Sequence, residues 1–264
     1  MSNVWVCVPS KRPPAEVEKW AQAWRDMGYR LALWRDWETV EGELSLWPFA
    51  NLCDHISAPR LRAGDDFDGY PGYAVATNAL IQRVINERAA QWCVIGGDDV
   101  WPDTTKRADE IAQECEAHFD NILGDPTRPF HVTPTFGVMQ PTGQRWGDKN
   151  GAYVDRVCGS AWLGREFCLS FKDGQGPLWP KFTHMYADEC LQNVATRLGV
   201  LWQRPDLTHD HRHWGRPREG ETMGMRDRMP EFLKKWNTDE HWRESKAEFE
   251  RLKVEDFASC MPTP

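Results

Sequence analysis

The sequence predicts an α/β fold in which a mixed, mainly parallel sheet is flanked by helices. Short apolar runs of strand length alternate with longer segments whose apolar residues recur every three to four positions. Two of these runs, residues 4–8 and 92–95, end in loops rich in Pro or Gly. The order strand, helix, strand over residues 4–34 is that of a right-handed crossover between two parallel strands.

The elements follow in order along the chain. The first helix is expected to start at Pro14, which suits the first helical position, and to stop before Gly28, which suits the C-cap. Strands are expected over residues 4–8, 31–34, 92–95, 130–136 and 200–203, and helices over 15–27, 73–90, 104–118 and 186–198.

Other stretches are less regular. No regular pattern covers residues 37–71, loops are expected over 137–151 and 209–215, and residues 157–163 and 167–171 are expected to be strand or short helix. The charged tail over 230–257 is predicted to be helical, with Asn237 and Glu240 spaced as a capping box.

Length and composition exclude several classes of protein. With 264 residues, the chain suits one large domain or two small, intimate ones. Hydrophobic residues make up 41% and charged residues 27%, a balance typical of globular proteins and not of disordered ones. The formal net charge of −8 argues against a protein that is wrapped in nucleic acid by bulk charge.

The distribution of apolar residues, cysteine and tryptophan adds three expectations. The apolar runs are too short to span a bilayer, and the start lacks a signal peptide's basic and apolar regions, so a cytoplasmic protein without a membrane partner is expected. Eight scattered cysteines without a C-x-x-C pair are expected to be reduced core thiols. Fifteen tryptophans exceed what a core alone needs, and indoles in a cleft stack on sugars and bases.

Asp98 and Asp99 directly follow a predicted buried strand. Two adjacent carboxylates at a sheet edge repel each other, and burying them is costly without a cation. Mg²⁺ prefers one or two carboxylates together with phosphate oxygens of a substrate, so a metal and diphosphate site is predicted. The alternative is a polar turn whose Asp residues cap the next helix.

Two further clusters carry chemistry. Asp188 and Glu189 at the start of a helix could act as a general base, or could only complement the helix dipole. In an extended segment His209, His211 and His213 would share a face, and one of them could complete a carboxylate-bound metal site. The alternative is a set of solvated or aromatic-packed histidines.

The order of these features resembles a known family. A strand followed by Pro-Ser-Lys-Arg-Pro at 9–13, a Gly-Asp-Asp motif at 97–99, the acid pair at 188–189 and the His-rich stretch resemble A-type-fold glycosyltransferases. Within that family the chain is most similar to small, soluble, family-two-like members encoded by bacteriophages. The resemblance implies a Rossmann-like sheet and a catalytic domain over 1–216. Residues 1–103 would bind the nucleotide sugar and 104–216 the acceptor, with a C-terminal helical extension, 217–264, packed on that domain.

The resemblance also implies roles for individual residues. Asp99 and either His209 or His211 would hold Mn²⁺ or Mg²⁺, while Asp188 and Glu189 would bind the acceptor and act as base. The nucleotide sugar would contact Val8, Pro9, Arg12, Asp36, Asn78 and Asp98, and the acceptor would contact Ser160 and Trp162. Two departures from the family pattern stand out: Gly97 replaces the first acid of the Asp-x-Asp motif, and the acid pair is Asp-Glu where the family usually has Glu-Asp.

The implied reaction is a metal-dependent, inverting displacement at the anomeric carbon of a nucleoside-diphosphate sugar. The leading acceptor is a hydroxymethylated pyrimidine in phage DNA, and a glycan or protein acceptor is the alternative. A nucleotidyltransferase of similar fold remains open, although residues 9–14 contain none of the glycines of a phosphate loop. A non-catalytic sugar- or nucleic-acid-binding module also remains open, and the oligomeric state is not predicted.

Overall fold

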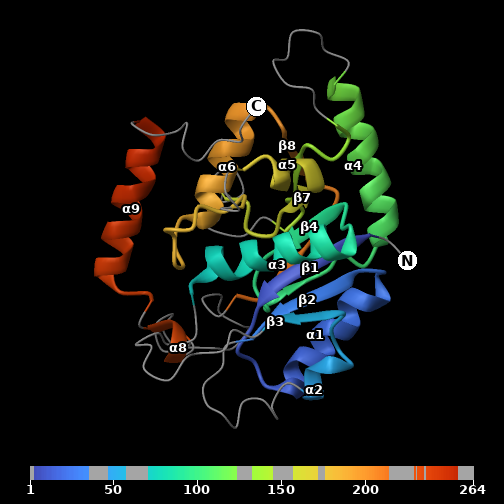
Figure 1. The fold of residues 1–264 in the computed structure, drawn as a ribbon, viewed down its shortest axis with the longest axis horizontal. Coiled ribbons are helices and arrows are strands. Elements are labelled where there is room, and N and C mark those ends of the chain that lie inside the picture. The colour runs from blue at the N-terminus through green and yellow to red at the C-terminus, as the bar shows by residue number, and fades with distance from the viewer. Residues whose placement is uncertain are drawn as a thin grey trace.

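The centre of the molecule is a seven-stranded sheet (Figure 1). This computed structural model describes residues 3–35, 47–57, 71–123, 133–144, 157–171, 176–213, 229, 231–234 and 236–254. The strands lie in the order β3 (His55–Ser57), β2 (Arg30–Trp34), β1 (Val4–Pro9), β4 (Trp92–Ile95), β7 (Trp162–Gly164), β6 (Val138–Pro141) and β8 (Leu201–Arg204). β7 is antiparallel to both of its neighbours, and the remaining pairs are parallel. The mixed, mainly parallel sheet is therefore confirmed.

Helices cover both faces of this sheet. The helices within the described residues are α1 (Pro14–Asp26), α2 (Trp47–Ala50), α3 (Tyr73–Arg88), α4 (Ala108–Leu123), α5 (Arg165–Leu169), α6 (Ala187–Leu198), α8 (Glu231–Lys234) and α9 (Asp239–Val254). The alternation of β1 explains the two layers, because Val6 packs into a core with α1 and α4 while Cys7 packs into a core with α3, α5 and α6. Figure 1 places α4 and α9 at opposite ends of the molecule, with α3 between them.

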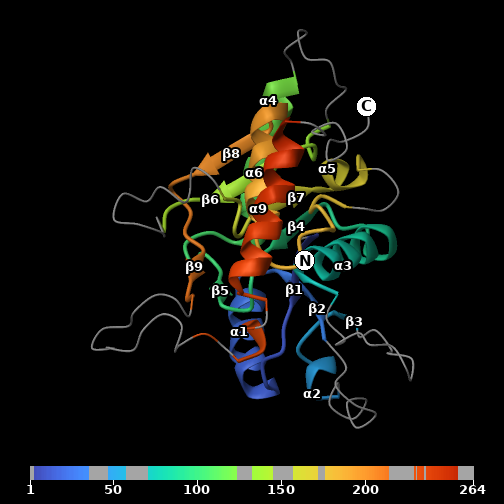
Figure 2. The ribbon, with the colours of Figure 1, turned by 90° about the vertical axis from the view of Figure 1, so that its left-hand side faces the viewer.

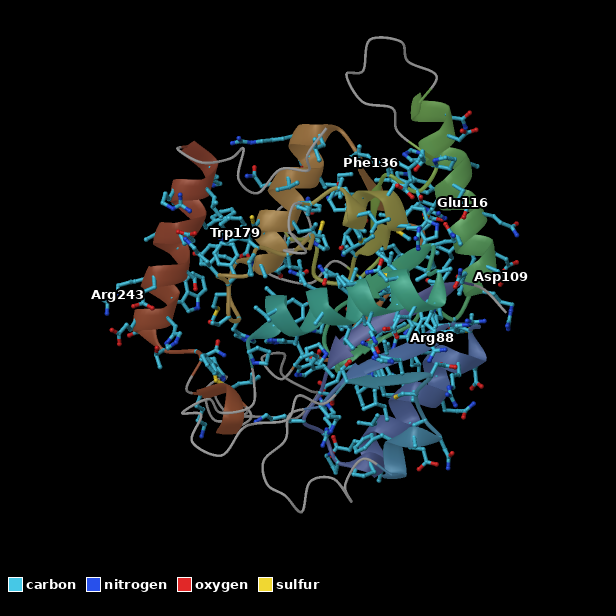
Figure 3. The ribbon with its side chains drawn as sticks, viewed as in Figure 1. Arg88, Asp109, Glu116, Phe136, Trp179 and Arg243 are labelled. Carbon is cyan, nitrogen blue, oxygen red and sulfur yellow. The ribbon has the colours of Figure 1, made fainter. Side chains whose placement is uncertain are left out.

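The C-terminal helix α9 packs alongside α6, as Figure 2 shows. The Arg197 guanidinium of α6 donates to the Lys253 carbonyl at 3.2 Å, and Phe249 and Leu252 of α9 join the core on the α6 face of the sheet. Figure 3 shows Trp179 on the side of α9 that faces the body and Arg243 on its outer side. The predicted domain boundary at 216 lies outside the described residues.

The longest apolar patterns are confirmed, and the prediction around residue 137 is wrong. A strand was expected over 130–136 and a loop from 137, yet 133–136 form no strand and β6 begins at Val138. Residues 130–132 lie outside the described residues. Gly137 suggests a loop, but a Cβ there would lie 2.4 Å from the Phe119 ring, so α4 packs against the start of β6 only because residue 137 is glycine. Gln140 of β6 is polar although it is fully buried, so the hydrophobic pattern of the sequence did not indicate this strand.

Smaller differences have local causes. α4 begins at Ala108 and not near 104, because the Asp103 carboxylate accepts the Thr105 amide at 2.6 Å and closes a turn there. α9 is capped by Thr238, whose hydroxyl accepts the His241 amide at 3.2 Å, and not by Asn237. Two-residue strands β5 (Val100–Trp101) and β9 (Asp210–His211) carry too few residues to show a period.

The burial of the cysteines and the hydropathy of the helices bear on two expectations from the composition. The seven cysteines among them are buried, as expected for thiols of the core, and Cys260 lies outside these residues. None of the helices in the described ranges combines the length and the hydropathy that a membrane span requires.

Candidate active site

The sheet topology brings three loops to one edge. β1 and β4 are parallel neighbours with Cys7 beside Ile95, so the loops that follow them, residues 10–13 and 96–99, lie side by side. β7 runs in the opposite direction, and the loop that precedes it, with Gly159, therefore reaches the same edge. These loops line a cleft of about 580 Å³. A crevice at the carboxyl ends of the strands is where open α/β sheets bind ligands.

The loop after β1 is tied to Asp98. The Ser10 hydroxyl donates to one carboxylate oxygen of Asp98 at 2.6 Å, and Arg12 Nε lies 3.0 Å from the other. The Arg35 guanidinium donates to the carbonyls of Ser10 and Arg12, each at 2.8 Å. Burial raises the pKa of Asp98, and the contacts from Arg12 and Ser10 offset this only in part. Asp98 is therefore held in place by the loop and is not free to turn.

Asp99 lies beside His211, with Oδ1 3.4 Å from the imidazole Nε2. Burial alone would raise the pKa of Asp99, but the hydrogen bond from His211 and the charges of His211, His213 and Arg12 outweigh it, so the pKa is lowered. A Cβ at Gly97 would lie 2.3 Å from Asp99 Oδ1. A side chain at residue 97 would therefore displace the Asp99 carboxylate from this position.

The position of His211 is set by several contacts on β9. β5 pairs with β9 in antiparallel register, with Val100 opposite His211. The Gln144 side chain accepts the His211 amide and donates to Asp210, both at 2.8 Å. The Arg212 guanidinium lies over the Trp101 ring, 4.0 Å from its centroid. His211 and Asp99 thus meet although 112 positions separate them.

The acid pair stands at the N-terminus of α6 and lines the same cleft. The Glu189 amide donates to the Asp188 carboxylate at 3.1 Å, and the preceding Tyr186 has a left-handed φ of 67°. Strained backbone of this kind is common at functional sites. His184, which sequence reasoning missed, also lines the cleft. Burial lowers the pKa of His184, and the charges of Asp188 and Asp99 act in the opposite direction.

Aromatic residues from the C-terminal segment complete the cleft. Trp236 and Trp242 line it, together with Leu233, Tyr73 and Tyr186. The high tryptophan content was the only sequence signal for this wall, and it did not indicate which indoles take part.

Five predicted contact residues do not line the cleft. Trp162 is fully buried against Tyr29 and Trp92, with ring centroids 5.5 and 6.5 Å away, so its indole is not a stacking platform. Ser160 is also buried, and of this segment Gly159 lines the cleft instead. The Val8 side chain lies in the core that α1 and α4 cover.

The other two are held elsewhere. Asn78 donates to the Leu178 carbonyl at 2.6 Å and accepts the Leu178 amide at 3.1 Å, so its amide group anchors a loop. The ring of His209 lies edge-on to Trp24, 5.2 Å between centroids, and burial lowers its pKa to about 4. Of the three histidines expected to share a face, His211 and His213 both line the cleft, and His209, which precedes β9, does not. Asp36 lies outside the described residues.

The donors available for a metal ion are few. Among the described side chains, no group of three or more His, Cys, Asp and Glu is placed to hold a metal ion. Asp99 and His211 provide two adjacent donors in a cleft that is open to a ligand. Mg²⁺ is commonly held by one or two carboxylates together with phosphate oxygens and water, so Asp99, with His211 as a second donor, fits an ion that arrives with a diphosphate.

Comparisons with known proteins give likenesses of fold only. No protein-family model matches the chain, and no curated protein does. The Staphylococcus aureus TarS 1–349 structure in complex with UDP is similar to 79% of this chain, with a TM-score of 0.46 and 10% identity, and this chain spans 59% of it.

Two further structures are similar to this chain, with lower TM-scores. A putative nucleotide-diphospho-sugar transferase from Desulfovibrio desulfuricans G20 has a TM-score of 0.37 at 10% identity, with 95% of this chain and 98% of that one covered. A glycosyltransferase involved in glycosylation of the major capsid of PBCV-1 has a TM-score of 0.34 at 9% identity, with 76% and 81% covered. These scores are too low to decide an activity.

Proposed function

We propose that this protein is a nucleotide-sugar-dependent glycosyltransferase. One observation carries the proposal: Asp98 and Asp99, at the end of a parallel strand, line the same cleft as the acid pair Asp188–Glu189 of α6. Transfer of a sugar between two substrates requires a place for a leaving diphosphate and a base for the incoming hydroxyl. Carboxylates with different surroundings in one cleft suit these two tasks.

The donor side of the proposed site is the wall formed by residues 9–13 and 96–99. Asp99 and His211 would hold Mn²⁺ or Mg²⁺, which supplies a Lewis acid that neutralises the charge of the departing diphosphate. Lys11 and Arg12 add positive charge to the same wall. Asp98, fixed by Ser10 and Arg12, is positioned to accept hydrogen bonds from ribose or sugar hydroxyls.

The acceptor side is the wall formed by α6. The acceptor oxygen attacks the anomeric carbon, and a new C–O bond forms as the bond from that carbon to the diphosphate breaks. The hydroxyl proton passes to the carboxylate of Asp188 or Glu189, and the electron pair leaves with the diphosphate. A single displacement of this kind inverts the anomeric configuration, so isolating a product with retained configuration would exclude it.

The acceptor in this proposal bears a hydroxyl group. The hydroxymethylated pyrimidine of DNA and the bacteriophage origin stay predictions. A glycan acceptor is favoured by the charge of the cleft, where carboxylates outnumber permanent cations among the described lining residues.

A thermal-shift and hydrolysis screen of nucleotide sugars, with and without Mn²⁺ or Mg²⁺, tests the proposal. We expect one nucleoside diphosphate to stabilise the wild type in the presence of metal, and the effect to be lost in Asp99→Ala. Asp109→Ala, on exposed α4, is the matched control and should keep the response. If no nucleotide stabilises the wild type under any metal, the proposal is wrong and the Asp98–Asp99 turn is structural.

A further inference from the structure

We propose that Trp242, with Tyr186 and Trp236, forms the acceptor subsite of this cleft, and that its occupant is an uncharged carbohydrate. The inference rests on the proposed function, which supplies the donor, and it adds the chemical class of the acceptor.

The exposure of Trp242 is the first observation. The indole is 47% exposed and lines the cleft, whereas Trp5, Trp20, Trp24, Trp92 and Trp162 are fully buried. The other large apolar side chain with comparable exposure among the described residues, Leu169 at 46%, does not line the cleft. An exposed indole at a concave site forgoes a large gain from burial, which a ligand covering its face would supply.

The indole is held in place before any ligand binds. Tyr186 packs edge-on against Trp242, with 5.2 Å between ring centroids, and its ring also lies 5.2 Å from Phe249. The Trp179 indole donates to Glu248 of α9 at 3.0 Å. This contact holds the side of α9 that faces the rest of the molecule, where Figure 3 labels Trp179. A rigid aromatic anchor loses little conformational entropy on binding.

The contact between Tyr186 and Trp242 links the indole to the acid pair. Tyr186 stands two positions before Asp188, and its left-handed φ turns the chain at this point into α6. A sugar ring packed on Trp242 would therefore lie beside the N-terminus of α6, where Asp188 and Glu189 line the cleft. The subsite and the proposed base are thus parts of one wall.

Charge selects a neutral occupant. The cleft is lined by Glu16, Asp98, Asp99, Asp188 and Glu189 against two permanent cations, Lys11 and Arg12. Arg12 is engaged by Glu16 at 2.9 Å and Asp98 at 3.0 Å. A metal ion would accompany the donor diphosphate but not an acceptor, so a phosphodiester backbone beside Asp188 and Glu189 would be repelled. Sugar hydroxyls donate to carboxylates, and the apolar face of a pyranose packs on an indole.

The described arginines between residues 201 and 213, Arg204 of β8 and Arg212 after β9, do not line the cleft. Arg204 is almost fully buried and pairs with Glu114 at 2.8 Å, and Arg212 pairs with Asp210 at 2.7 Å. The described part of the chain thus provides aromatic and acidic groups at this wall, which is the chemistry of carbohydrate recognition.

Saturation-transfer NMR on the full chain tests the inference, with methyl β-glycosides of glucose, galactose and N-acetylglucosamine and their β-linked trisaccharides as probes. We expect saturation of ring protons in the wild type and at least a tenfold weaker affinity in Trp242→Leu, which keeps apolar bulk but removes the ring. Trp242→Phe should recover to within about threefold of the wild type, because it restores an aromatic face. Leu169→Ala, the control, should match the wild type.

A parallel thermal shift with the stabilising nucleotide separates the two proposals. Nucleotide stabilisation without saturation of any glycoside would overturn the acceptor proposal and leave the glycosyltransferase proposal standing. Glycoside binding that depends on Trp242, without nucleotide stabilisation, would overturn the glycosyltransferase proposal and leave the carbohydrate subsite standing. Equal glycoside affinity in wild type and Trp242→Leu, or saturation only of single-stranded DNA containing 5-hydroxymethylcytosine, would also overturn it.

Discussion

The two walls of the cleft are built in different ways. The wall of residues 9–13 and 96–99 follows the ends of two paired strands and is held by short polar contacts, such as the 2.6 Å bond from Ser10 to Asp98. The wall of α6 and α9 joins segments distant in the sequence and is held mainly by ring packing, such as that of Tyr186 on Trp242.

This difference predicts how each wall responds to change. Hydrogen bonds and ion pairs are directional, so the first wall should respond to single changes of charge. The free energy gained by packing rings is roughly proportional to the apolar area buried. The stability of the second wall should therefore fall when aromatic surface or helix stability is lost.

The largest effect is expected from the acid pair. In Asp188→Asn and Glu189→Gln, the variant that removes the base should lower kcat for transfer about 10²–10⁴-fold, the usual contribution of general base catalysis. The other variant should change the acceptor KM more than kcat. Both should keep nucleotide binding by thermal shift, and full activity in both variants would rule out a base at this position.

His209 should make stability depend on pH. Its pKa is lowered to about 4 in the folded protein by burial, against about 6.5 in an unfolded chain, so the unfolded state binds a proton first as pH falls. Stability should be unaffected above pH 6.5 and fall by about 3 kcal/mol between pH 6.5 and 4. His209→Leu should lose this dependence in denaturant unfolding at pH 7 and 4.5, whereas the same slope in both proteins would contradict the assignment.

Arg12→Leu should lower the free energy of unfolding by about 1–2 kcal/mol. This is less than the loss expected for a fully buried ion pair, because solvent reaches the Arg12 guanidinium. Burial already raises the pKa of Asp98, and loss of Arg12 should raise it further. The cost is therefore full at neutral pH and shrinks as the carboxyl takes up a proton at lower pH. Adding Asp98→Asn should recover most of the stability in urea unfolding. Equal losses in the single and double variants would mean that the pairing is not the cause.

The smallest effect is expected from Thr238→Ala. Loss of this N-cap should destabilise α9 by about 1 kcal/mol, equivalent to roughly fivefold faster local hydrogen exchange. Amides of β1 and β4 should exchange as in the wild type. A uniform acceleration over sheet and helix would show that α9 does not open independently of the first wall.

Sequence reasoning located correctly, at the edge of the sheet, the residues whose position follows from strand ends. Asp98 and Asp99 line the cleft because acids after a buried run lie at the carboxyl edge of a sheet, and Arg12 lines it because its loop follows the neighbouring strand. It failed for Trp162 and Asn78, because whether such a side chain points into the cleft or the core depends on local register and packing. His209 lies before β9 and packs on Trp24, so strand alternation does not relate it to His211 and His213, which both line the cleft.

By itself, the sequence determined the alternation of strands and helices, the two-sided burial of the sheet and the acids at its edge, because these depend on local periodicity and on parallel pairing of neighbouring strands. Only the tertiary structure decided that His211 meets Asp99, that His184 lies near both acid groups, and that Trp236 and Trp242 close the cleft. These contacts join segments tens of residues apart through packing and short bridges, and no local pattern in the chain encodes which distant surfaces will meet.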